Sequence, residues 1–435
     1  MLVLREAIRG ATDLPEDPVG KAPRQRCLTT ATKQIIFINR FFFPDHSATS
    51  QLLTDLTFHM ARHGYPVRVI TSRQRYDNPS AGLTKRESVE GVDIYRVSTT
   101  QFGRAALVGR GFDYLSFYTS VWRSVLRVAR PGDILVAKTD PPLLSIPALR
   151  AVRRRGLRLV NWLQDLYPEV AMALDVPLVR GPVAKGLQHL RDTTLRAAAA
   201  NVVVGEQMAE IVRSRGIAVP VHVIPNWCDD DDIQPIAPSD NPLRRRWGIE
   251  GRFVVGYSGN LGRGHEFETI LDAAEHLRSH PNILFLFIGG GHKFDELARQ
   301  VHQRKLDSAF RFFPYQERAA LTHSLSVPDV HWISLKPELE GLIVPSKVYG
   351  IAAAGRPIIS ITARDGEIAR LVQRHRCGII VEPGRGHHLA EELRRLSADP
   401  SARAEMGLRA RAMLEKHFTR QQAFARWDQL FGTIA

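Results

Sequence analysis

The sequence has few cysteines and no long apolar run. Its three cysteines, Cys27, Cys228 and Cys377, have no paired spacing. This scarcity argues against a disulfide framework or a zinc site and suits a reducing compartment, so we expect a cytoplasmic protein. Apolar runs such as 283–288 are far shorter than the about 18 residues that a membrane-spanning helix needs. The first 33 residues mix acidic and basic groups and lack the apolar centre of a secretory signal.

Acidic residues are scarce relative to basic ones in the first half of the chain. Residues 1–225 hold 31 Lys/Arg and 19 Asp/Glu, a net charge of +12, whereas residues 226–435 hold 28 and 26, a net charge of +2. The excess indicates an anionic partner for the N-terminal half, such as nucleic acid, an anionic membrane surface or a phosphorylated substrate. A general preference of the genome for arginine would give the same composition. Apolar residues at 44% and charged residues at 24% exclude a fibrous or wholly disordered chain.

Short apolar runs alternate with longer amphipathic stretches from residue 33 onward. Several runs are almost wholly apolar, as expected for parallel strands covered by helices on both faces. The alternation occurs in two sets, which predicts an α/β fold with two Rossmann-like, doubly wound domains. The predicted strands are 34–39, 67–71, 92–97, 133–137, 158–163, 201–205 and 221–225 in the first set, and 253–259, 283–289, 310–314, 330–334, 357–361 and 378–382 in the second.

Breaks in the periodicity divide the chain. Residues 1–32 show no periodicity, and we interpret them as a mobile extension or as residues before the true start of the protein. The two domains are predicted at 33–225 and 251–415. The linker between them, 226–250, contains Asp229 to Asp232; four consecutive carboxylates cannot all face one metal ion, so we expect a solvated linker and no metal site. Residues 416–435 are predicted to form a C-terminal helix that packs back toward the N-terminal domain.

Three loops of the second half follow predicted strands, where ligands of open α/β sheets bind. The segment 258–266, SGNLGRGHE, combines a glycine turn with a helix start, and 289–293, GGGHK, places three glycines after a strand. Both arrangements suit a phosphate, although ordinary βα turns contain the same residues. In the segment 337–357, a helix start puts Lys347 in the first turn. A cation there is unfavourable against the helix dipole unless an anion is bound, which indicates a functional site.

Four segments together resemble family 4 glycosyltransferases, in the branch of the WbuB/WcaI-type transferases of bacterial exopolysaccharide and O-antigen synthesis. They are QDLYPE (164–169), the IPNW-x-D pattern (224–229), SGNLG (258–262) and PSKVYGIAAAGRP (345–357). The resemblance runs from about residue 34 to the C-terminus. It implies the GT-B architecture, with two Rossmann-like domains facing across a cleft. The C-terminal domain is expected to hold a nucleotide-diphosphate sugar and the N-terminal domain a saccharide or lipid-linked saccharide acceptor. Transfer is expected to be retaining and to need neither metal nor cofactor.

The resemblance also assigns the donor site, with departures. Asn260 and His265 stand where many members have arginine and lysine, and Leu342 and Gly350 stand where many have two glutamates. Lys347 then becomes the best candidate for the catalytic cation at the diphosphate, aided by Arg263. The expected donor contacts, with Glu338 and Glu340 as substitutes for the first glutamate, are Gly259, Asn260, Leu261, Gly262, Arg263, Gly290, Tyr315, Glu338, Glu340, Pro345, Ser346 and Tyr349.

The acceptor site is expected in the first half. Asp165 matches the aspartate of a His-Asp pair common in the family and would accept a proton or a hydrogen bond from the acceptor hydroxyl. A helix N-cap is the alternative interpretation of Asp165. Further acceptor contacts are expected from the loop after the first strand, where the family often has two glycines, and from the end of QDLYPE. These residues are His46, Ser47, Thr49 and Glu169.

Basic segments leave other partners open. The segment 110–130 mixes arginines with Phe112, Leu115, Trp122 and Leu126, so it is either a basic amphipathic helix on anionic lipid or a core-packing helix with a solvated basic face. A second basic patch is RRRGLR at 153–158. A sugar-nucleotide 2-epimerase on the same architecture is the alternative enzyme. A basic nucleic-acid-binding protein is the alternative of another class, but no recognition motif supports it and we expect no nucleic-acid partner.

Overall fold

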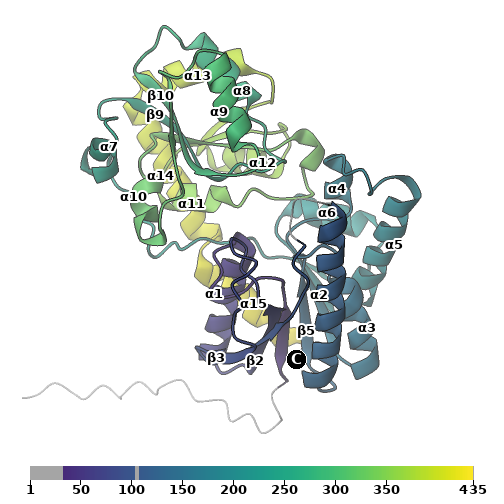
Figure 1. Ribbon diagram of the computed structural model, residues 1–435. Helices are drawn as coiled ribbons and strands as arrows, with labels where there is room; N and C mark the ends of the chain where they lie inside the picture. The colour runs from purple at the N-terminus through teal and green to yellow at the C-terminus, as the bar shows by residue number, and fades with distance from the viewer. Residues whose placement is uncertain (1–32, 103–106, 435) are drawn as a thin grey trace, which may run out of the picture. The chain divides into compact units, whose positions relative to one another are not determined.

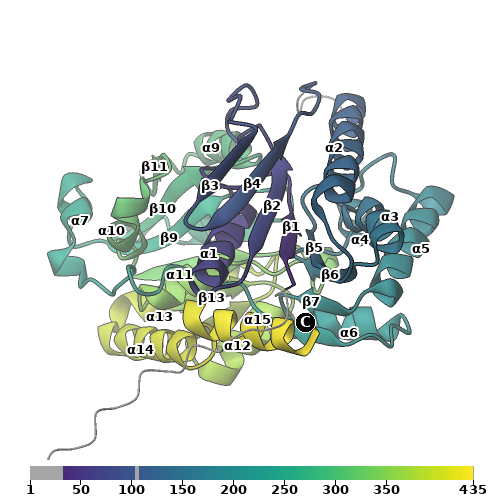
Figure 2. The ribbon, with the colours of Figure 1, turned by 90° about the horizontal axis from the view of Figure 1, so that it is seen from below.

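The structure contains two sheets, one in each half of the chain. It is a computed structural model that describes residues 33–102 and 107–434, and the predicted extension at 1–32 lies outside the described residues. The first sheet has the strand order β3-β4-β2-β1-β5-β6-β7-β8, and Figure 2 shows β3 to β7 in this order. The second sheet has the order β11-β10-β9-β12-β13-β14 and is parallel throughout. The predicted α/β class with two doubly wound sheets is therefore confirmed.

Seven strands of the first sheet agree with the predicted strands to within two residues at each end. The strands are β1 (Ile35–Ile38), β2 (Val67–Ser72), β3 (Arg86–Val89), β4 (Val92–Val97), β5 (Ile134–Lys138), β6 (Arg158–Leu163), β7 (Ala200–Val203) and β8 (Val221–Val223). The helices are α1 (Ala48–Arg62), α2 (Leu107–Val128), α3 (Ser145–Arg155), α4 (Glu169–Ala173), α5 (Gly181–Ala197) and α6 (Glu206–Ser214). The strand that the sequence did not predict is β3, an antiparallel edge strand whose side chains are exposed or half-buried.

The six predicted strands of the second sheet agree with the structure to within one residue. The strands are β9 (Phe253–Asn260), β10 (Ile283–Gly290), β11 (Phe310–Phe313), β12 (Val330–Ser334), β13 (Ile358–Ile361) and β14 (Gly378–Val381). The helices of this half are α7 (Pro242–Arg246), α8 (Glu268–His276), α9 (Phe294–Gln303), α10 (Leu321–Leu325), α11 (Lys347–Ala353), α12 (Glu367–His375), α13 (Gly386–Ala398) and α14 (Pro400–His417), followed by α15 (Arg420–Ile434). Single 3-10 turns, η1 (Pro238–Asp240), η2 (Arg318–Ala320) and η3 (Pro337–Leu339), lie in the connections.

The apolar strands are explained by burial on both faces of each sheet. In β1, Ile35 and Phe37 pack into the core formed with α1 and α15, whereas Ile36 and Ile38 pack into the core formed with α2 and α3. A strand covered on both sides needs no polar face, so every position is apolar. Burying each such side chain stabilises the fold by about 1.5–3 kcal/mol relative to exposure.

The C-terminal helix belongs to the first sheet. Phe424, Trp427 and Phe431 of α15 are buried in the core of this sheet, and the rings of Trp427 and Trp162 have centroids 4.7 Å apart. Figure 1 shows α15, in yellow, beside α1, in purple. The chain therefore crosses between the halves twice, once before α7 and once between α14 and α15.

The acidic run between the halves is ion-paired, which corrects the expectation of a solvated linker. Asp229 and Asp231 accept hydrogen bonds from the guanidinium of Arg420 at 2.8 and 2.6 Å. Asp230 accepts one from the backbone N–H of Arg420 at 3.0 Å. Arg318 forms a further ion pair with Asp229. The run therefore fastens the two crossing segments to each other.

The helices of the described residues were also assessed as membrane spans. Among residues 33–102 and 107–434, no helix combines the length and the apolar character that crossing a membrane requires.

Candidate functional site

The candidate donor site is built on three loops that follow β9, β10 and β12. The backbone N–H of Leu261 donates to the carbonyl of Gly290 at 2.7 Å, and that of Lys293 donates to the carbonyl of Leu261 at 3.0 Å. On the other side, the N–H of Lys336 donates to the carbonyl of Gly264 at 3.0 Å. The loop after β9 is thus held between the other two loops by the backbone, which fixes the side chains that it carries.

Lys347 and His265 form the polar centre of this site. The ammonium Nζ of Lys347 donates to Nε2 of His265 at 3.3 Å, and Nδ1 of His265 donates to the carbonyl of Ser334 at 2.7 Å. Nζ also lies 5.1 Å from the ring centroid of Tyr257. The resemblance led us to expect a lysine at the position of His265, and here His265 contacts a lysine that comes from α11. The sequence analysis noted His265 as a departure and gave it no role.

Burial shifts the pKa values of both groups toward their neutral forms. Burial and the nearby Lys347 cation lower the pKa of His265 to about 3, so the imidazole is neutral at pH 7. Burial also lowers the pKa of Lys347 to about 8. A bound anion would reverse this shift, because an opposite charge favours the ammonium form. Lys347 is therefore a partly desolvated cation for which an anionic partner is energetically favourable.

Gly259 provides the space in which Lys347 lies. A Cβ at this position would come within 3.1 Å of Cε of Lys347, and the backbone has φ of +119°, a conformation that L side chains rarely adopt. Glycine is thus needed here for both space and conformation. The sequence predicted that Gly259 admits a phosphate; the structure adds that it admits the lysine.

Two tyrosines from opposite halves lie near Gly290. Tyr315 follows β11, and a Cβ at Gly290 would come within 3.2 Å of its ring. Burial raises the pKa of Tyr315, and the electrostatic influence of Tyr76 from the first half adds to the shift. Both side chains are about half exposed, at 59% for Tyr315 and 48% for Tyr76. They form an accessible aromatic edge beside the glycine-rich loop.

The other predicted donor residues divide by exposure. Asn260, Arg263, Glu338 and Ser346 are exposed, and Gly262 is half-buried, so these positions are accessible to a ligand. Three other predicted donor residues are buried in the second half: Leu261, Pro345 and Tyr349. Their side chains do not reach an open surface, which differs from the direct contacts expected of them.

Glu340 lies against α12 instead of an open donor pocket. The backbone of Ala363 and Glu367 lies close enough to its carboxyl group to lower the pKa, and a Cβ at Gly366 would meet a Glu340 carboxylate oxygen at 2.4 Å. Burial raises the pKa of Glu340 to about 7, despite the opposing effect of these backbone groups. The structure therefore places Glu340 beside the N-terminus of α12, where a carboxylate is favourable, and its contact with the donor stays a prediction.

Asp165 follows β6 and lines a small cavity. The cavity has a volume of about 20 Å³, enough for one water molecule, and Lys138, Thr139 and Arg191 also line it. The hydroxyl of Thr139 hydrogen-bonds to the carboxyl group of Asp165, whereas Oδ1 of Asp165 is buried without a partner in the described residues. Burial raises its pKa to about 6. The predicted acceptor residue is thus a partly desolvated carboxyl group that borders a cavity large enough for one water molecule.

Tyr167 lines the same cavity as Asp165, and Tyr114 and Tyr118 lie near Tyr167. Burial raises the pKa of Tyr167, and the neighbouring Tyr114 and Asp165 add to the shift. The rings of Tyr114 and Tyr118 have centroids 6.4 Å apart, and the Tyr118 hydroxyl donates to the carbonyl of Pro142. The polar edges and apolar faces of tyrosine suit contacts with sugars, but no motif in the sequence brings these three residues together.

The predicted acceptor residues of the first loop lie at the start of α1. His46 is exposed, and the hydroxyl of Ser47 donates to the carboxylate of Asp45 at 2.5 Å. The carbonyl of Thr49 accepts a hydrogen bond from Nζ of Lys138 at 3.0 Å. Lys138 is buried, its Nζ lies 3.6 Å from the ring centroid of Trp162, and burial lowers its pKa to about 7.

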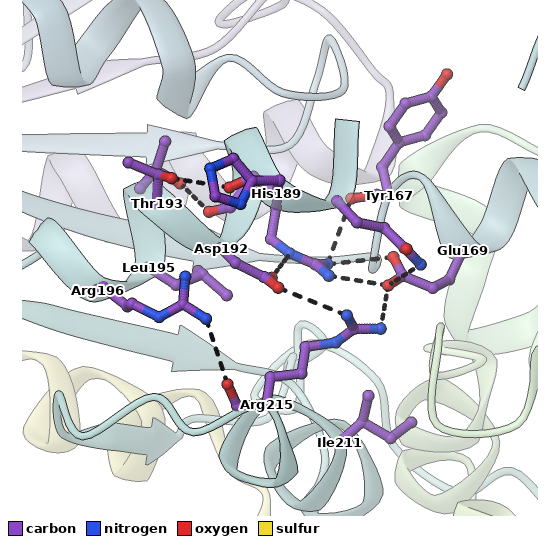
Figure 3. A network of polar contacts seen from close by, with 12 residues as sticks. Tyr167, Glu169, His189, Asp192, Thr193, Leu195, Arg196, Ile211 and Arg215 are labelled. Carbon is purple, nitrogen blue, oxygen red and sulfur yellow. Dashed lines mark hydrogen bonds and ion pairs between the residues drawn. The ribbon is translucent and has the colours of Figure 1, made fainter. Parts of the chain in front are cut away.

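Glu169 lies in an ion-pair network, shown in Figure 3, and not on an open surface. Its carboxylate accepts hydrogen bonds from the guanidinium of Arg191 at 2.8 and 3.2 Å and from Gln188 at 3.1 Å, and it also pairs with Arg215. Asp192 binds the same two arginines, at 2.7 and 3.6 Å. The side chain of Glu169 is 11% exposed. Both oxygens are therefore committed to protein partners, in contrast to the expected acceptor contact.

The two candidate sites are joined by contacts between the halves. The backbone N–H of Leu166 donates to the carbonyl of Leu342 at 2.9 Å. The carboxylate of Glu367 accepts hydrogen bonds from the N–H groups of Glu206 and Gln207, at 3.2 and 3.0 Å, at the start of α6. Asp165 and the segment before Lys347 thus belong to one contact region. Within the described residues, no three His, Cys, Asp or Glu side chains are grouped so that they could hold a metal ion.

Two family models match most of the chain. Residues 49–227 match the glycosyl transferase 4-like domain, and residues 239–413 match the glycosyl transferases group 1. Each match covers one of the two sheets and the helices around it. The chain therefore belongs to the family 4 glycosyltransferases of the GT-B architecture.

Individual relatives agree with this classification. WbjE of Pseudomonas aeruginosa, a probable glycosyltransferase, is 28% identical over 56% of this chain and 61% of its own length. WcaI of Escherichia coli, whose name ascribes to it a glycosyl transferase role in colanic acid biosynthesis, is 25% identical over 88% of this chain and 93% of its own length. Among solved structures, sucrose-phosphate synthase from Thermosynechococcus elongatus has a TM-score of 0.74 at 16% identity, over 92% of this chain and 99% of that chain. HepE of Anabaena with UDP has a TM-score of 0.69 at 16% identity, over 92% and 100%.

Proposed function

We propose that the protein transfers a sugar from a nucleotide-diphosphate donor to a saccharide or lipid-linked saccharide, with retention of the anomeric configuration, in the synthesis of a bacterial surface polysaccharide. The observation that carries the proposal is the desolvated Lys347 cation held by neutral His265 at the ends of β9 and β12. The related HepE, solved with UDP and with UDP-glucose, supports a nucleotide-sugar donor. The name of WcaI supports a polysaccharide pathway.

In this proposal Lys347 stabilises the departing diphosphate. Breaking the bond between the sugar and the diphosphate increases the negative charge on the leaving group, and a preorganised cation in a dry site lowers that barrier. Because His265 donates Nδ1–H to Ser334, its Nε2 can only accept, so it orients the ammonium without competing for the phosphate. The protein's own cation would then supply the charge stabilisation, without a metal or another cofactor.

The acceptor is proposed to bind in the first half, close to Asp165. With a pKa of about 6, its carboxyl group is mostly ionised at pH 7 and can accept a proton or a hydrogen bond from a hydroxyl. Glu169 acts indirectly, because the backbone carbonyl of Tyr167 accepts a hydrogen bond from Arg191, which Glu169 holds. The ion-pair network therefore positions the segment that carries Asp165.

The arginine patch on α2 and α3 is proposed to face anionic lipid at the inner side of the cytoplasmic membrane. In the part of the chain that the structure describes, none of the arginines of this patch forms an ion pair with a carboxylate. The patch consists of Arg123, Arg127, Arg130 and the run 153–155. The half-buried Trp122 and Leu126 pack against the core, so α2 has a solvated basic face and not a lipid-inserting one at this end. The patch would act by charge alone, at about 1 kcal/mol for each cation near the surface.

A transfer assay tests the proposed function. The protein is incubated with labelled sugar nucleotides and with lipid-linked saccharides extracted from bacteria, and free nucleoside diphosphate and labelled lipid are measured together. We expect both products in equal amounts. Free nucleotide without labelled lipid, or conversion of the sugar nucleotide into an epimer, would contradict transfer. Lipid contact is tested separately, by co-sedimentation with vesicles of neutral or anionic phospholipid; equal binding to both would contradict the role of the patch.

A further inference from the structure

A second pocket rich in cations lies beside the Lys347 site. It has a volume of about 310 Å³, within the range of about 300–1,000 Å³ typical of ligand pockets. One side is formed by Arg263, His292, Lys293 and Lys336, from the three loops that follow β9, β10 and β12. The facing side is formed by the end of α4 and the residues after it, which belong to the first half. Residues of both halves therefore line the pocket, so either substrate could reach it.

Three cations of this pocket have no carboxylate partner. In the described ranges 33–102 and 107–434, neither Arg263 nor Lys293 nor Lys336 forms an ion pair, although Nζ of Lys293 lies 5.2 Å from the ring centroid of Phe267. Other cations of this half are paired: Arg304 contacts three carboxylates within 3.9 Å. Lys293 and Lys336 are also half-buried, which makes the missing counter-charge costly.

Two carboxylates, Asp175 and Glu296, also line the pocket. Asp175 pairs with Arg180 at 3.1 Å, and both of these side chains are exposed. Glu296 lies in the first turn of α9, where the helix dipole favours an acidic side chain. Neither lies within 4.0 Å of Arg263, Lys293 or Lys336 in an ion pair. The pocket thus retains an excess of positive charge.

Backbone hydrogen bonds hold together the three loops that carry these cations. The loop that carries Arg263 is bonded through the carbonyl of Leu261 to Lys293 and through the carbonyl of Gly264 to Lys336. The two lysines therefore flank Arg263 on a backbone framework of two 3.0 Å hydrogen bonds. Preorganised cations of this kind bind an anion without a large cost in ordering.

We propose that this pocket binds an anionic group, a carboxylate or a phosphate, that the substrates carry in addition to the diphosphate of the donor. The inference rests on the proposed glycosyl transfer and deepens it. Lys347 would bind the diphosphate of the donor, and one of the two substrates would carry a further acidic group. The pocket walls come from both halves, so the anionic group belongs either to the transferred sugar or to the acceptor. Both sources present the same chemistry to Arg263, Lys293 and Lys336.

The first step of the test separates this inference from the proposed function. UDP, GDP and dTDP are titrated by calorimetry into the wild type and into Lys293→Met, Lys336→Met and the control Arg299→Met, an exposed cation of α9 outside the pocket. If no nucleotide binds the wild type, the proposed function fails. We expect one to bind and both pocket variants to retain its affinity within about fivefold, because salt screens a single charge away from the bound group. A larger loss would mean that the pocket holds the diphosphate itself, which would overturn the inference.

The second step identifies the anionic group. The first pair of probes are donors: the nucleotide that binds best carries either glucose, which is neutral, or glucuronate, which is acidic. The second pair are acceptors: farnesyl is joined to glucose either directly, in farnesyl glucoside, or through a diphosphate, which makes the probe acidic. We expect the wild type to prefer the acidic member of one pair by at least about tenfold, as for a desolvated charge contact. Lys293→Met and Lys336→Met should abolish the preference, and Arg299→Met should keep it. Preference in the first pair assigns the group to the donor sugar, and in the second to the acceptor. No preference in either pair, or a preference that both variants retain, would overturn the inference.

Discussion

Buried and half-buried cations are partnered differently in the two halves of the molecule. In the second half, Lys347 is held by a neutral histidine, and the cations of the adjacent pocket have no carboxylate partners in the described residues. In the first half, Arg191 and Arg215 are neutralised by Glu169 and Asp192. We therefore propose that one half offers an anion-binding site, whereas the corresponding charges of the other half are ion-paired within the protein. Changes in the second half should impair substrate binding and turnover, and changes in the first-half network should impair stability.

The largest effect is expected from Lys347→Ala. If the ammonium stabilises the departing diphosphate, its loss should raise the barrier by about 2–4 kcal/mol, as for other preorganised electrostatic groups. Turnover would fall by roughly thirtyfold to several hundredfold. The measurement is kcat in the transfer assay, with thermal unfolding to verify the fold and Lys416→Ala, an exposed lysine of α14, as the control. Turnover near that of the control would remove Lys347 from the mechanism.

The comparable experiment in the first half is Glu169→Gln. Removing the carboxylate leaves Arg191 and Arg215 with less counter-charge, and we expect the free energy of unfolding to fall by about 2–3 kcal/mol, less than for a fully buried pair because Arg215 is partly exposed. Chemical denaturation measures this. Asp175→Asn, which breaks an exposed ion pair with Arg180, should change stability little. Equal losses in both variants would contradict the structural role of the network.

Gly259→Ala tests the space around Lys347. The new methyl group would lie within 3.1 Å of Cε, so the lysine must move, and we expect nucleotide affinity to fall about tenfold. Gly384→Ala is the matched control, since Gly384 also has a positive φ, of +82°, but nothing within 4 Å of the position of its Cβ. Both variants should lose a similar amount of stability from backbone strain. If calorimetry found the same nucleotide affinity in both, the close contact with Lys347 would have no part in binding.

The pH dependence of nucleotide binding is the subtlest expected effect. The pKa of Lys347 is about 8 without ligand, and a bound diphosphate raises it. Affinity should therefore be constant well below pH 8 and fall as pH rises above 8, by at most about tenfold per pH unit, because the free protein has lost the proton that the complex needs. Lys347→Arg should weaken this dependence, since arginine stays protonated. Equal wild-type affinity at pH 7 and pH 9 would contradict a role for the ammonium.

The fold was predictable because its strands are buried on both faces. Runs such as 35–38 and 283–288 are wholly apolar for this reason. In contrast, β3 escaped prediction because it is an edge strand with polar, exposed positions and thus lacks that signal.

The candidate site was predictable only in part. Lys347 was recognisable from the conflict between a cation and a helix start. The role of His265 was not, because its 3.3 Å contact with Lys347 joins residues 82 apart in sequence. Glu169 was assigned to the acceptor because it stands near Asp165 in QDLYPE; its arginine partners were not recognisable, since they lie 22 and 46 residues away and only the fold brings them to it.

The central claim is that the second half holds the nucleotide and the first half holds the acceptor. It is tested most directly by calorimetric titration of the nucleoside diphosphate into Asp165→Asn and Lys347→Met side by side. The account predicts that Asp165→Asn binds within about twofold of the wild type, whereas Lys347→Met loses about tenfold or more in affinity. Loss of binding in Asp165→Asn together with unchanged binding in Lys347→Met would contradict it.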